Sequence, residues 1–304
     1  MANRIDFIDT LKGLAILIVV AHHIPYVSLD LCGIQNCFLE DFKYIRNFIY
    51  MPFFMVLFFI TSGMCSNFNK TFDEFLKKTL YVIIPCYIFC RCSHWFINAF
   101  IISRVVYYFI NKYVNGDILK HIVCLALGGV ACIVQGILYK HAPYHVFHAL
   151  LMVWFIYIGH RYKDFILNLR YEIIASVFYL ITSMFCYYYL HDIPAFESGF
   201  HVTIMTYPLF ISMAVSGTMM LTMIARIVNN KLFQYLGMMS IVIFCVHFDF
   251  LKILISKYGY MLHNLDNFKT ALCFIIIFLL TSVFSWFIAK LLDNKYGKYL
   301  IGKY

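Results

Sequence analysis

Apolar runs long enough to cross a lipid bilayer recur from one end of the chain to the other. A membrane-spanning helix needs about 20 consecutive apolar residues, because the hydrocarbon layer is about 30 Å thick and a helix rises about 1.5 Å per residue. Such runs lie at about 13–29, 47–66, 121–139, 143–159, 172–190, 201–225, 236–256 and 270–289. These runs predict a bundle of transmembrane helices.

The composition excludes a water-soluble protein. Of the 304 residues, 63% are hydrophobic and only 13% are charged, whereas soluble domains carry about 25% charged residues. The mean hydropathy is +0.80. The net charge of +9 does not indicate a nucleic-acid partner, because Lys and Arg lie mostly in short segments between the apolar runs. We therefore expect a multi-pass protein whose surroundings are membrane lipid.

The stretch 79–110 decides the topology. It can form one long helix or a pair of helices broken around Arg91–His94. Cytoplasmic loops collect Lys and Arg, and the two-helix reading places most of the basic residues on one side. We therefore expect an all-α polytopic protein of about ten transmembrane helices, with both termini cytoplasmic. It would form a single domain, 1–304, in the inner (cytoplasmic) membrane, and its first helix would stay as an anchor.

Lys12 and His23 are the most informative pair of residues. Eleven positions bring two side chains to within about 20° of each other on a helix, about 16 Å apart along its axis. His23 lies well inside the apolar run, just before the helix-stopping Pro25. An ionisable residue inside such a run marks a candidate functional site. The alternative is that Lys12 is a positive-inside anchor and His23 snorkels at the far interface.

Four segments, in order along the chain, resemble the membrane acyltransferase-3 family. Arg4–His23 has the family's basic residue, ten intervening residues and histidine, and its Asp-x-x-Lys-Gly form is similar to a short branch that includes sugar O-acetyltransferases. Phe53–Met64 resembles the aromatic second helix that ends in Ser-Gly. Phe75–Pro85 resembles the basic loop before a proline-bearing third helix, and Leu236–His247 resembles the late Gly-x-x-Ser…His helix.

The resemblance implies an integral membrane O-acyltransferase, which transfers groups other than amino-acyl groups. It would move an acyl group, acetyl in the first instance, from cytoplasmic acetyl-CoA (acyl-CoA) to a hydroxyl of a cell-surface glycan or its lipid-linked precursor. His23 would act as the catalytic base or as a transient acyl carrier. His247 would assist at the acceptor. The adjacent His22 leaves open which imidazole of the first helix acts.

A basic cluster at the cytoplasmic mouth is expected to hold the anionic head of the acyl-CoA. Lys12, Lys77 and Lys78 are its members, and a shaft open to the cytosol would bring the thioester to His23. In the family the third segment normally carries two arginines. The adjacent lysines here keep the charge but lose the planar fork that grips phosphate with two hydrogen bonds.

Three further residues are candidates for binding substrate. Asp9 lies three residues before Lys12, on the same helix face, where it can orient the lysine or simply solubilise the helix start. Ser62 closes the second run and has either a packing role or a direct one. Ser240 lies seven residues before His247, on nearly the same face.

Two other classes of function compete with the enzyme. One is a membrane transporter or exporter of a glycan or small metabolite, and the other is a helical sensor or assembly subunit without catalysis. A metal site is not expected, because His145 and His148 have no HExxH motif or carboxylate beside them. Cys32 and Cys37 share a loop and can form a disulfide there. The sequence specifies neither the acceptor, the acyl chain nor a homo-oligomer.

Overall fold

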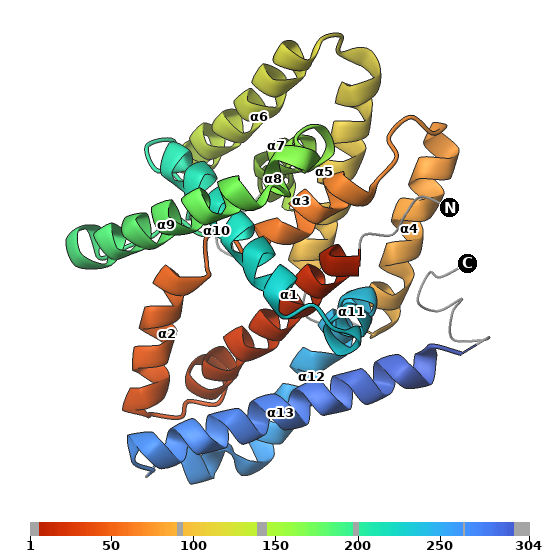
Figure 1. Ribbon diagram of the computed structural model, residues 1–304. Coiled ribbons are helices and arrows are strands. Elements are labelled where there is room, and N and C mark those ends of the chain that lie inside the picture. The colour runs from red at the N-terminus through yellow and green to blue at the C-terminus, as the bar shows by residue number, and fades with distance from the viewer. Residues whose placement is uncertain (1–5, 90–93, 139–144, 197–200, 264, 295–304) are drawn as a thin grey trace. The chain divides into compact units, whose positions relative to one another are not determined.

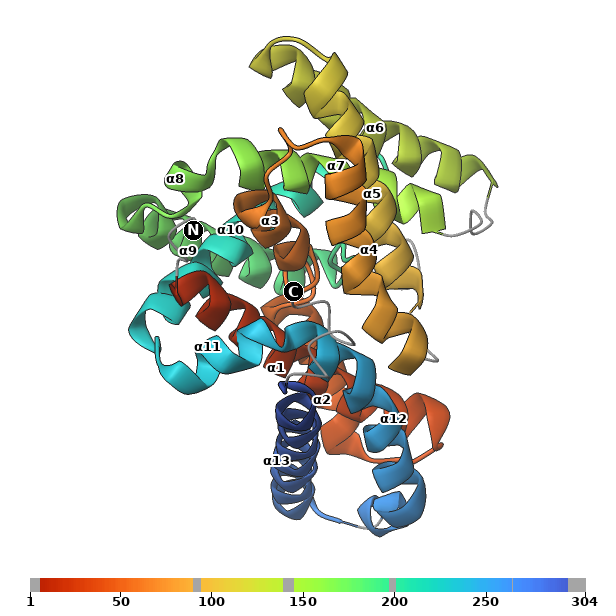
Figure 2. The ribbon, with the colours of Figure 1, turned by 90° about the vertical axis from the view of Figure 1, so that its right-hand side faces the viewer.

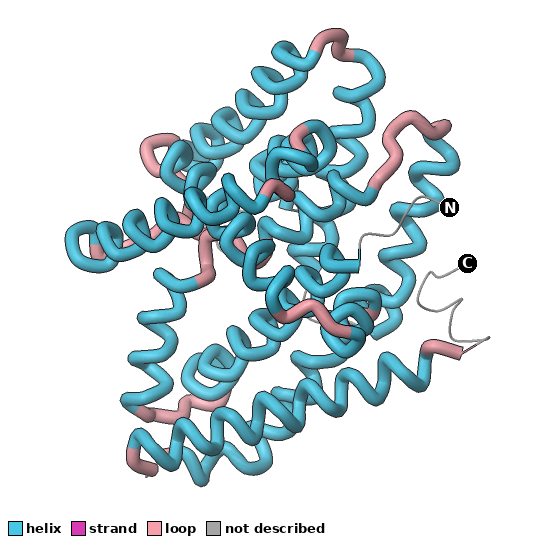
Figure 3. The backbone as a smooth tube through the Cα atoms, in the orientation of Figure 1, coloured by secondary structure: helices cyan, strands magenta, loops and turns pink. Residues whose placement is uncertain are grey.

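The computed structural model describes residues 6–89, 94–138, 145–196, 201–263 and 265–294. The regular structure of these described residues consists of helices, without a strand (Figure 3). Five of their helices are long and apolar enough to cross a membrane, or six if a bent pair of helices counts as one span. An all-α chain with several membrane-length helices is therefore confirmed, and the number ten stays a prediction.

The chain divides into two compact units. Unit 1 comprises residues 1–49, 84–92 and 228–304, and unit 2 comprises residues 50–83 and 93–227. The helices of unit 1 are α1 (Asp6–Pro25), η1 (Tyr26–Leu31), α2 (Cys37–Ile49), α11 (Lys231–Met238), α12 (Ser240–Tyr258), η4 (Gly259–Leu262) and α13 (Asn267–Leu292). α4 (Phe72–Phe89) contributes residues to both units. The helices of unit 2 are α3 (Val56–Cys65), α5 (His94–Tyr113), α6 (Asp117–Leu138), α7 (Val146–Arg161), α8 (Lys163–Ile166), α9 (Leu169–Phe185), η3 (Cys186–Leu190) and α10 (Tyr207–Ile227). The expectation of a single domain stays a prediction.

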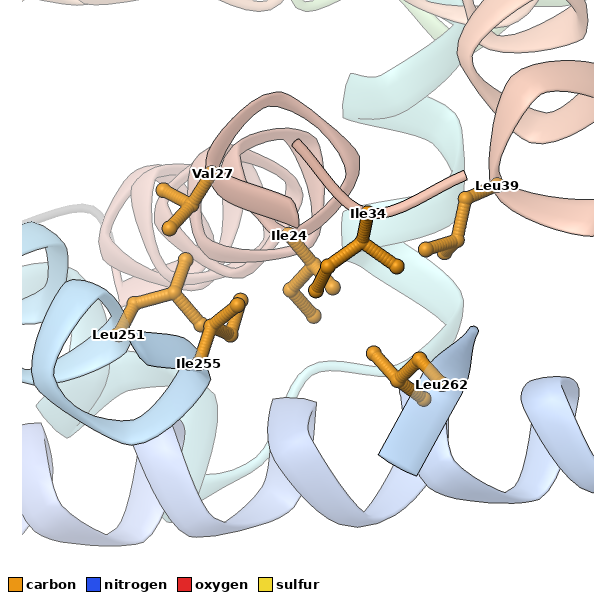
Figure 4. Packing of buried hydrophobic residues seen from close by; sticks show 7 residues of the cluster. All are labelled: Ile24, Val27, Ile34, Leu39, Leu251, Ile255 and Leu262. Atoms are coloured by element: carbon orange, nitrogen blue, oxygen red, sulfur yellow. The ribbon is translucent and has the colours of Figure 1, made fainter. Parts of the chain in front are cut away.

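The hydrophobic core of unit 1 holds the end of α1 against the middle of α12. Ile24, Leu251 and Ile255 belong to one buried cluster (Figure 4). Ile24 directly follows His23, and Leu251 lies four residues after His247. Burying each of these side chains contributes about 1.5–3 kcal/mol, so the cluster fixes the two histidine-bearing segments side by side.

Two glycines let α1 and α11 approach closely (Figures 1 and 2). A Cβ atom on Gly237 of α11 would overlap the carbonyl of Asp9, and one on Gly13 of α1 would overlap the carbonyl of Phe233. Small residues permit this kind of close packing between membrane helices. The first two turns of α1 therefore lie directly on α11.

Replacing Gly237 by alanine is expected to destabilise the protein by about 1–3 kcal/mol, because the added methyl group forces α1 and α11 apart. Gly136→Ala in α6 is the matched control. A Cβ atom there meets nothing within 4 Å in the described part of the chain, and alanine is the better helix former. Thermal unfolding of the purified variants in detergent measures the difference. Equal stability of the two variants would contradict the close contact.

In unit 2, α7 packs against α3, α5 and α6, and α9 packs against α10 (Figure 1). Most side chains of α7 are buried. α3 has 10 residues and α7 has 16, fewer than the roughly 20 that span a bilayer alone. The apolar run 47–66 thus forms a shorter helix than the sequence predicts, whereas α7 covers most of the run 143–159.

Pro25 is the last residue of the α-helical part of the first helix, as the sequence predicts, but helical structure continues beyond it. α1 includes this proline and continues into the π-helical segment η1. In a π turn, an N–H bonds to the carbonyl five residues back, as Cys32 N does to Val27 O at 3.0 Å. The first helix therefore changes from α-helical to π-helical turns directly after this proline.

The loop expected around Cys32 and Cys37, in the polar connection 30–46, differs from expectation, and so does the run 47–66. α2 occupies much of that connection and ends at Ile49, whereas α3 begins only at Val56. Pro52 lies between them, and the residue before a proline disfavours the helical conformation. One expected span is therefore two separate helices.

The two-helix reading of 79–110 is confirmed. α4 ends at Phe89, α5 begins at His94, and the two helices meet through Thr79 and Arg104, whereas residues 90–93 lie outside the described residues. α4 begins at Phe72, so Lys77 and Lys78 lie within a helix rather than in the predicted loop.

Candidate functional site

The structure brings the two predicted histidines together in unit 1. Nε2 of His247 lies 3.3 Å from Nδ1 of His23, and the ring centroids are 5.0 Å apart. His247 is completely buried, whereas His23 is only half-buried. The Phe248 ring meets the His23 ring edge-on at 5.3 Å. The site is therefore a pair of imidazoles in an aromatic setting, with His23 as its accessible member.

Hydrogen bonds to the backbone fix which ring nitrogen carries the proton. Nδ1 of His23 lies 2.8 Å from the Val19 carbonyl, and Nδ1 of His247 lies 2.9 Å from the Ile243 carbonyl. A carbonyl oxygen only accepts, and a neutral imidazole has one N–H. In the neutral pair both protons are therefore on Nδ1, and each Nε2 has a lone pair.

This assignment gives the two imidazoles different tasks. The Nδ1–H of His23 is shared between the Val19 carbonyl and Nε2 of His247. The second contact orients the His23 ring. Nε2 of His23 has no hydrogen-bond partner among the described residues. A half-buried ring with a lone pair free of internal partners can take a proton from a hydroxyl group. The pair thus has the form of a base held by a second residue.

The predicted pairing of Asp9 with Lys12 is confirmed. Nζ of Lys12 lies 3.0 Å from Oδ1 of Asp9, and the two side chains are 24% and 9% exposed. Lys12 is thus oriented at the start of α1, three turns before His23. Lys77 and Lys78 are exposed on α4, in unit 2. A common donor site for the three lysines stays a prediction.

The two candidate serines have different surroundings. Ser62 is buried on α3, and its hydroxyl accepts a hydrogen bond from Nη1 of Arg104. Ser240 is the first residue of α12, two turns before His247, and it is half-buried. The substrate contacts expected of both serines remain predictions.

Two arginines of the described chain were given no role by the sequence analysis. Arg46 is buried on α2, and it donates hydrogen bonds to the backbone carbonyls of His22 and Lys43. Its position seven residues after the buried Leu39 places it on the inner face of α2, a spacing that the sequence already contains. Arg104 of α5 stands within an apolar run, which is itself a functional signal.

An open cavity of about 540 Å³ lies in unit 1, lined by the segment 29–35 and one face of α2. Its polar lining residues are Asp30, Gln35, Glu40, Lys43, Tyr44 and Asn47. Asp30 and Lys43 form an ion pair at 2.7 Å. Carboxylate, ammonium and amide groups beside an exposed tyrosine suit a ligand with many hydroxyl groups.

The shaft expected to lead to His23 stays a prediction. His23 lines neither the polar cavity of unit 1 nor an apolar cavity of about 430 Å³ in unit 2. The described residues contain no group of three or more His, Cys, Asp or Glu that could hold a metal ion. Cys32 and Cys37 are both free thiols, so the disulfide considered for them is not formed.

Comparisons of the chain with models of protein families, with curated proteins and with solved structures give no match.

Proposed function

We propose that the protein is an integral membrane O-acyltransferase in which His23 is the catalytic base. The observation that carries the proposal is the His23–His247 pair. One imidazole, held through its Nδ1–H by a backbone carbonyl and by the second imidazole, keeps a lone pair on Nε2. Ionisable side chains on two apolar helices, α1 and α12, are costly to bury and are typical of a functional site.

The proposed step is a direct transfer. The acceptor hydroxyl gives its proton to Nε2 of His23 while its oxygen attacks the thioester carbonyl of the acyl-CoA. The carbon–sulfur bond then breaks, and the leaving thiolate takes the proton back from the imidazolium. The products are an ester and free CoA, and the enzyme is returned unchanged. His247 keeps the ring of His23 in its orientation throughout.

The resemblance of four segments to the acyltransferase-3 family implies the two substrates. Lys12, Lys77 and Lys78 would hold the anionic head of a cytoplasmic acetyl-CoA. The polar cavity of unit 1 would receive the acceptor, a hydroxyl of a cell-surface glycan or its lipid-linked precursor. We also propose the finer topology of ten spans with cytoplasmic termini in the inner membrane, on the distribution of Lys and Arg.

A carrier is the rival function, and one observation favours it. α11 and the helix that begins at Ser240 are bent by 80° at a one-residue break, and transporters build binding sites from discontinuous helices. Release of CoA measured with a thiol reagent separates the two functions. We expect purified wild-type protein in detergent to release thiol slowly from acetyl-CoA, and faster with a glycan acceptor. Substrate counterflow in vesicles without any CoA consumption would instead establish a carrier.

A further inference from the structure

Arg104 is a half-buried cation in unit 2, and no carboxylate among the described residues pairs with it. Among the described side chains, its guanidinium bonds only to hydroxyl groups: Nη1 to Ser62 and, at 3.0 Å, to Ser66, and Nε to Thr79 at 3.4 Å. The guanidinium also lies over the rings of Phe75 and Phe100, 5.4 and 5.5 Å from their centroids. Three hydroxyls and two aromatic rings do not neutralise a positive charge.

Two other arginines of unit 2 show what a structural role requires. Arg226 lies 3.0 Å from the buried carboxylate of Glu172, and Arg161 lies 2.8 Å from Asp117. A charge held away from water is costly unless it has a counter-charge. Arg104 lies beside the C-terminal end of α3, and a helix end supplies only about half a negative charge. Part of the charge of Arg104 is therefore still to be balanced.

The arrangement also leaves hydrogen-bond donors free. A guanidinium has five N–H groups, and the two on Nη2 have no acceptor among the described residues. Ser62 and Ser66 use lone pairs to accept from Arg104, so their own protons are also available in the described part of the molecule. By contrast, Thr79 donates its proton to the Phe75 carbonyl at 3.0 Å.

We propose that Arg104, Ser62 and Ser66 form a binding site for a phosphate-type oxyanion. The planar guanidinium and two hydroxyl groups supply donors of the kind that phosphate oxygens accept, and the aromatic walls limit competition from water. An oxyanion there balances the charge that the described residues do not. Neither serine needs to move, because each already lies against the guanidinium.

Two molecules could supply this phosphate. One is the acyl-CoA donor, and assigning it rests on the proposed function. Lys77 and Lys78 directly precede Thr79, so the guanidinium fork that these lysines lack is supplied nearby by α5. The other source is the phosphate of an anionic phospholipid. Both molecules offer a phosphate group to the same donors, and the experiment below separates the two sources.

The test measures binding and not catalysis. The full chain, purified in detergent, is unfolded thermally at constant ionic strength in the presence of coenzyme A, pyrophosphate or micellar phosphatidylglycerol. We expect at least one of them to raise the Tm of the wild-type protein, because a ligand that binds only the folded state stabilises it. Arg104→Gln should weaken the apparent affinity for that ligand at least tenfold. The affinity of Arg104→Lys, which keeps the charge and loses the planar fork, should lie between the affinities of the wild-type protein and Arg104→Gln.

Lys112→Gln is the matched control, because it removes one cation from the same helix and should bind like the wild-type protein. If Arg104→Gln fails to fold, Ser66→Ala decides, since it keeps the guanidinium and removes one donor. It should bind several-fold more weakly. Binding of phosphatidylglycerol alone assigns the site to lipid and leaves the proposed acyl transfer unaffected. His23→Ala, which changes no residue of this site, should bind the ligand as the wild-type protein does. No stabilisation of the wild-type protein, or equal stabilisation of Arg104→Gln or of a folded Ser66→Ala protein, overturns the proposal.

Discussion

Replacing His23 by alanine is expected to lower the rate of acyl transfer by about two to four orders of magnitude. Removing a general base has an effect of this size. Among the described residues, His23 is the base whose ring His247 orients. The readout is acyl-CoA-dependent release of thiol by purified protein. Binding of coenzyme A and the Tm should stay close to wild-type values.

Two companion variants make this result specific. His263→Ala removes an exposed histidine of the same unit and should leave the rate unchanged. His247→Leu removes the acceptor of the His23 N–H and should slow transfer about fivefold, because a hydrogen bond is worth about 1 kcal/mol and about 1.36 kcal/mol is a factor of ten. A His23→Ala enzyme that transfers at the wild-type rate would rule out the proposed base.

The second large effect is expected at Glu172, and it concerns stability. This carboxylate is completely buried, and its two oxygens share the single Nε–H of Arg226 in a bifurcated hydrogen bond, at 3.0 and 3.1 Å. Arg226 also donates to the Leu167 carbonyl. Glu172→Gln keeps the shape of the side chain and removes its charge. Because breaking a buried pair costs about 3–5 kcal/mol and Arg226 is about a third exposed, we expect a loss of about 3 kcal/mol.

The exposed pair of Lys70 and Glu74 provides the control in the same unit. Its side chains are 35% and 59% exposed, so Glu74→Gln should cost less than about 1 kcal/mol. Glu172→Leu combined with Arg226→Met should recover most of the loss, because no charge is then left without its partner. Denaturant unfolding in mixed micelles measures the free energy of unfolding of Glu172→Gln, Glu74→Gln and the double variant. Equal stability of Glu172→Gln and Glu74→Gln would show that the buried pair is unimportant.

Local patterns predicted the helical elements well. Apolar runs placed most of the membrane-length helices, and the charge distribution correctly divided 79–110 into two. The exceptions have local causes that were underweighted: Pro52 separates α2 from α3, and the amphipathic spacing of Leu39 and Arg46 indicates a helix within the polar connection. Pro25 ends the α-helical turns but not the helical segment, which continues as η1.

The site was less predictable, because its contacts join distant parts of the chain. His23 and His247 are 224 positions apart, and only the family resemblance, not any periodicity, suggested that both belong to one site. Asp9 and Lys12 were paired correctly because three residues on a helix is a local distance. The partners of Arg104 come from α3, the residue after it, and α4, so no spacing reveals them. An arginine within an apolar run was nevertheless a visible signal.

The most direct test of the central claim is mass spectrometry of surface glycans from cells that contain the wild-type protein, the His23→Ala protein or neither. The account predicts that one glycan carries an additional acyl ester, removable by mild base, only in cells with the wild-type protein. Glycans that are identical in all three strains, or an ester that persists with His23→Ala at wild-type abundance, would contradict it.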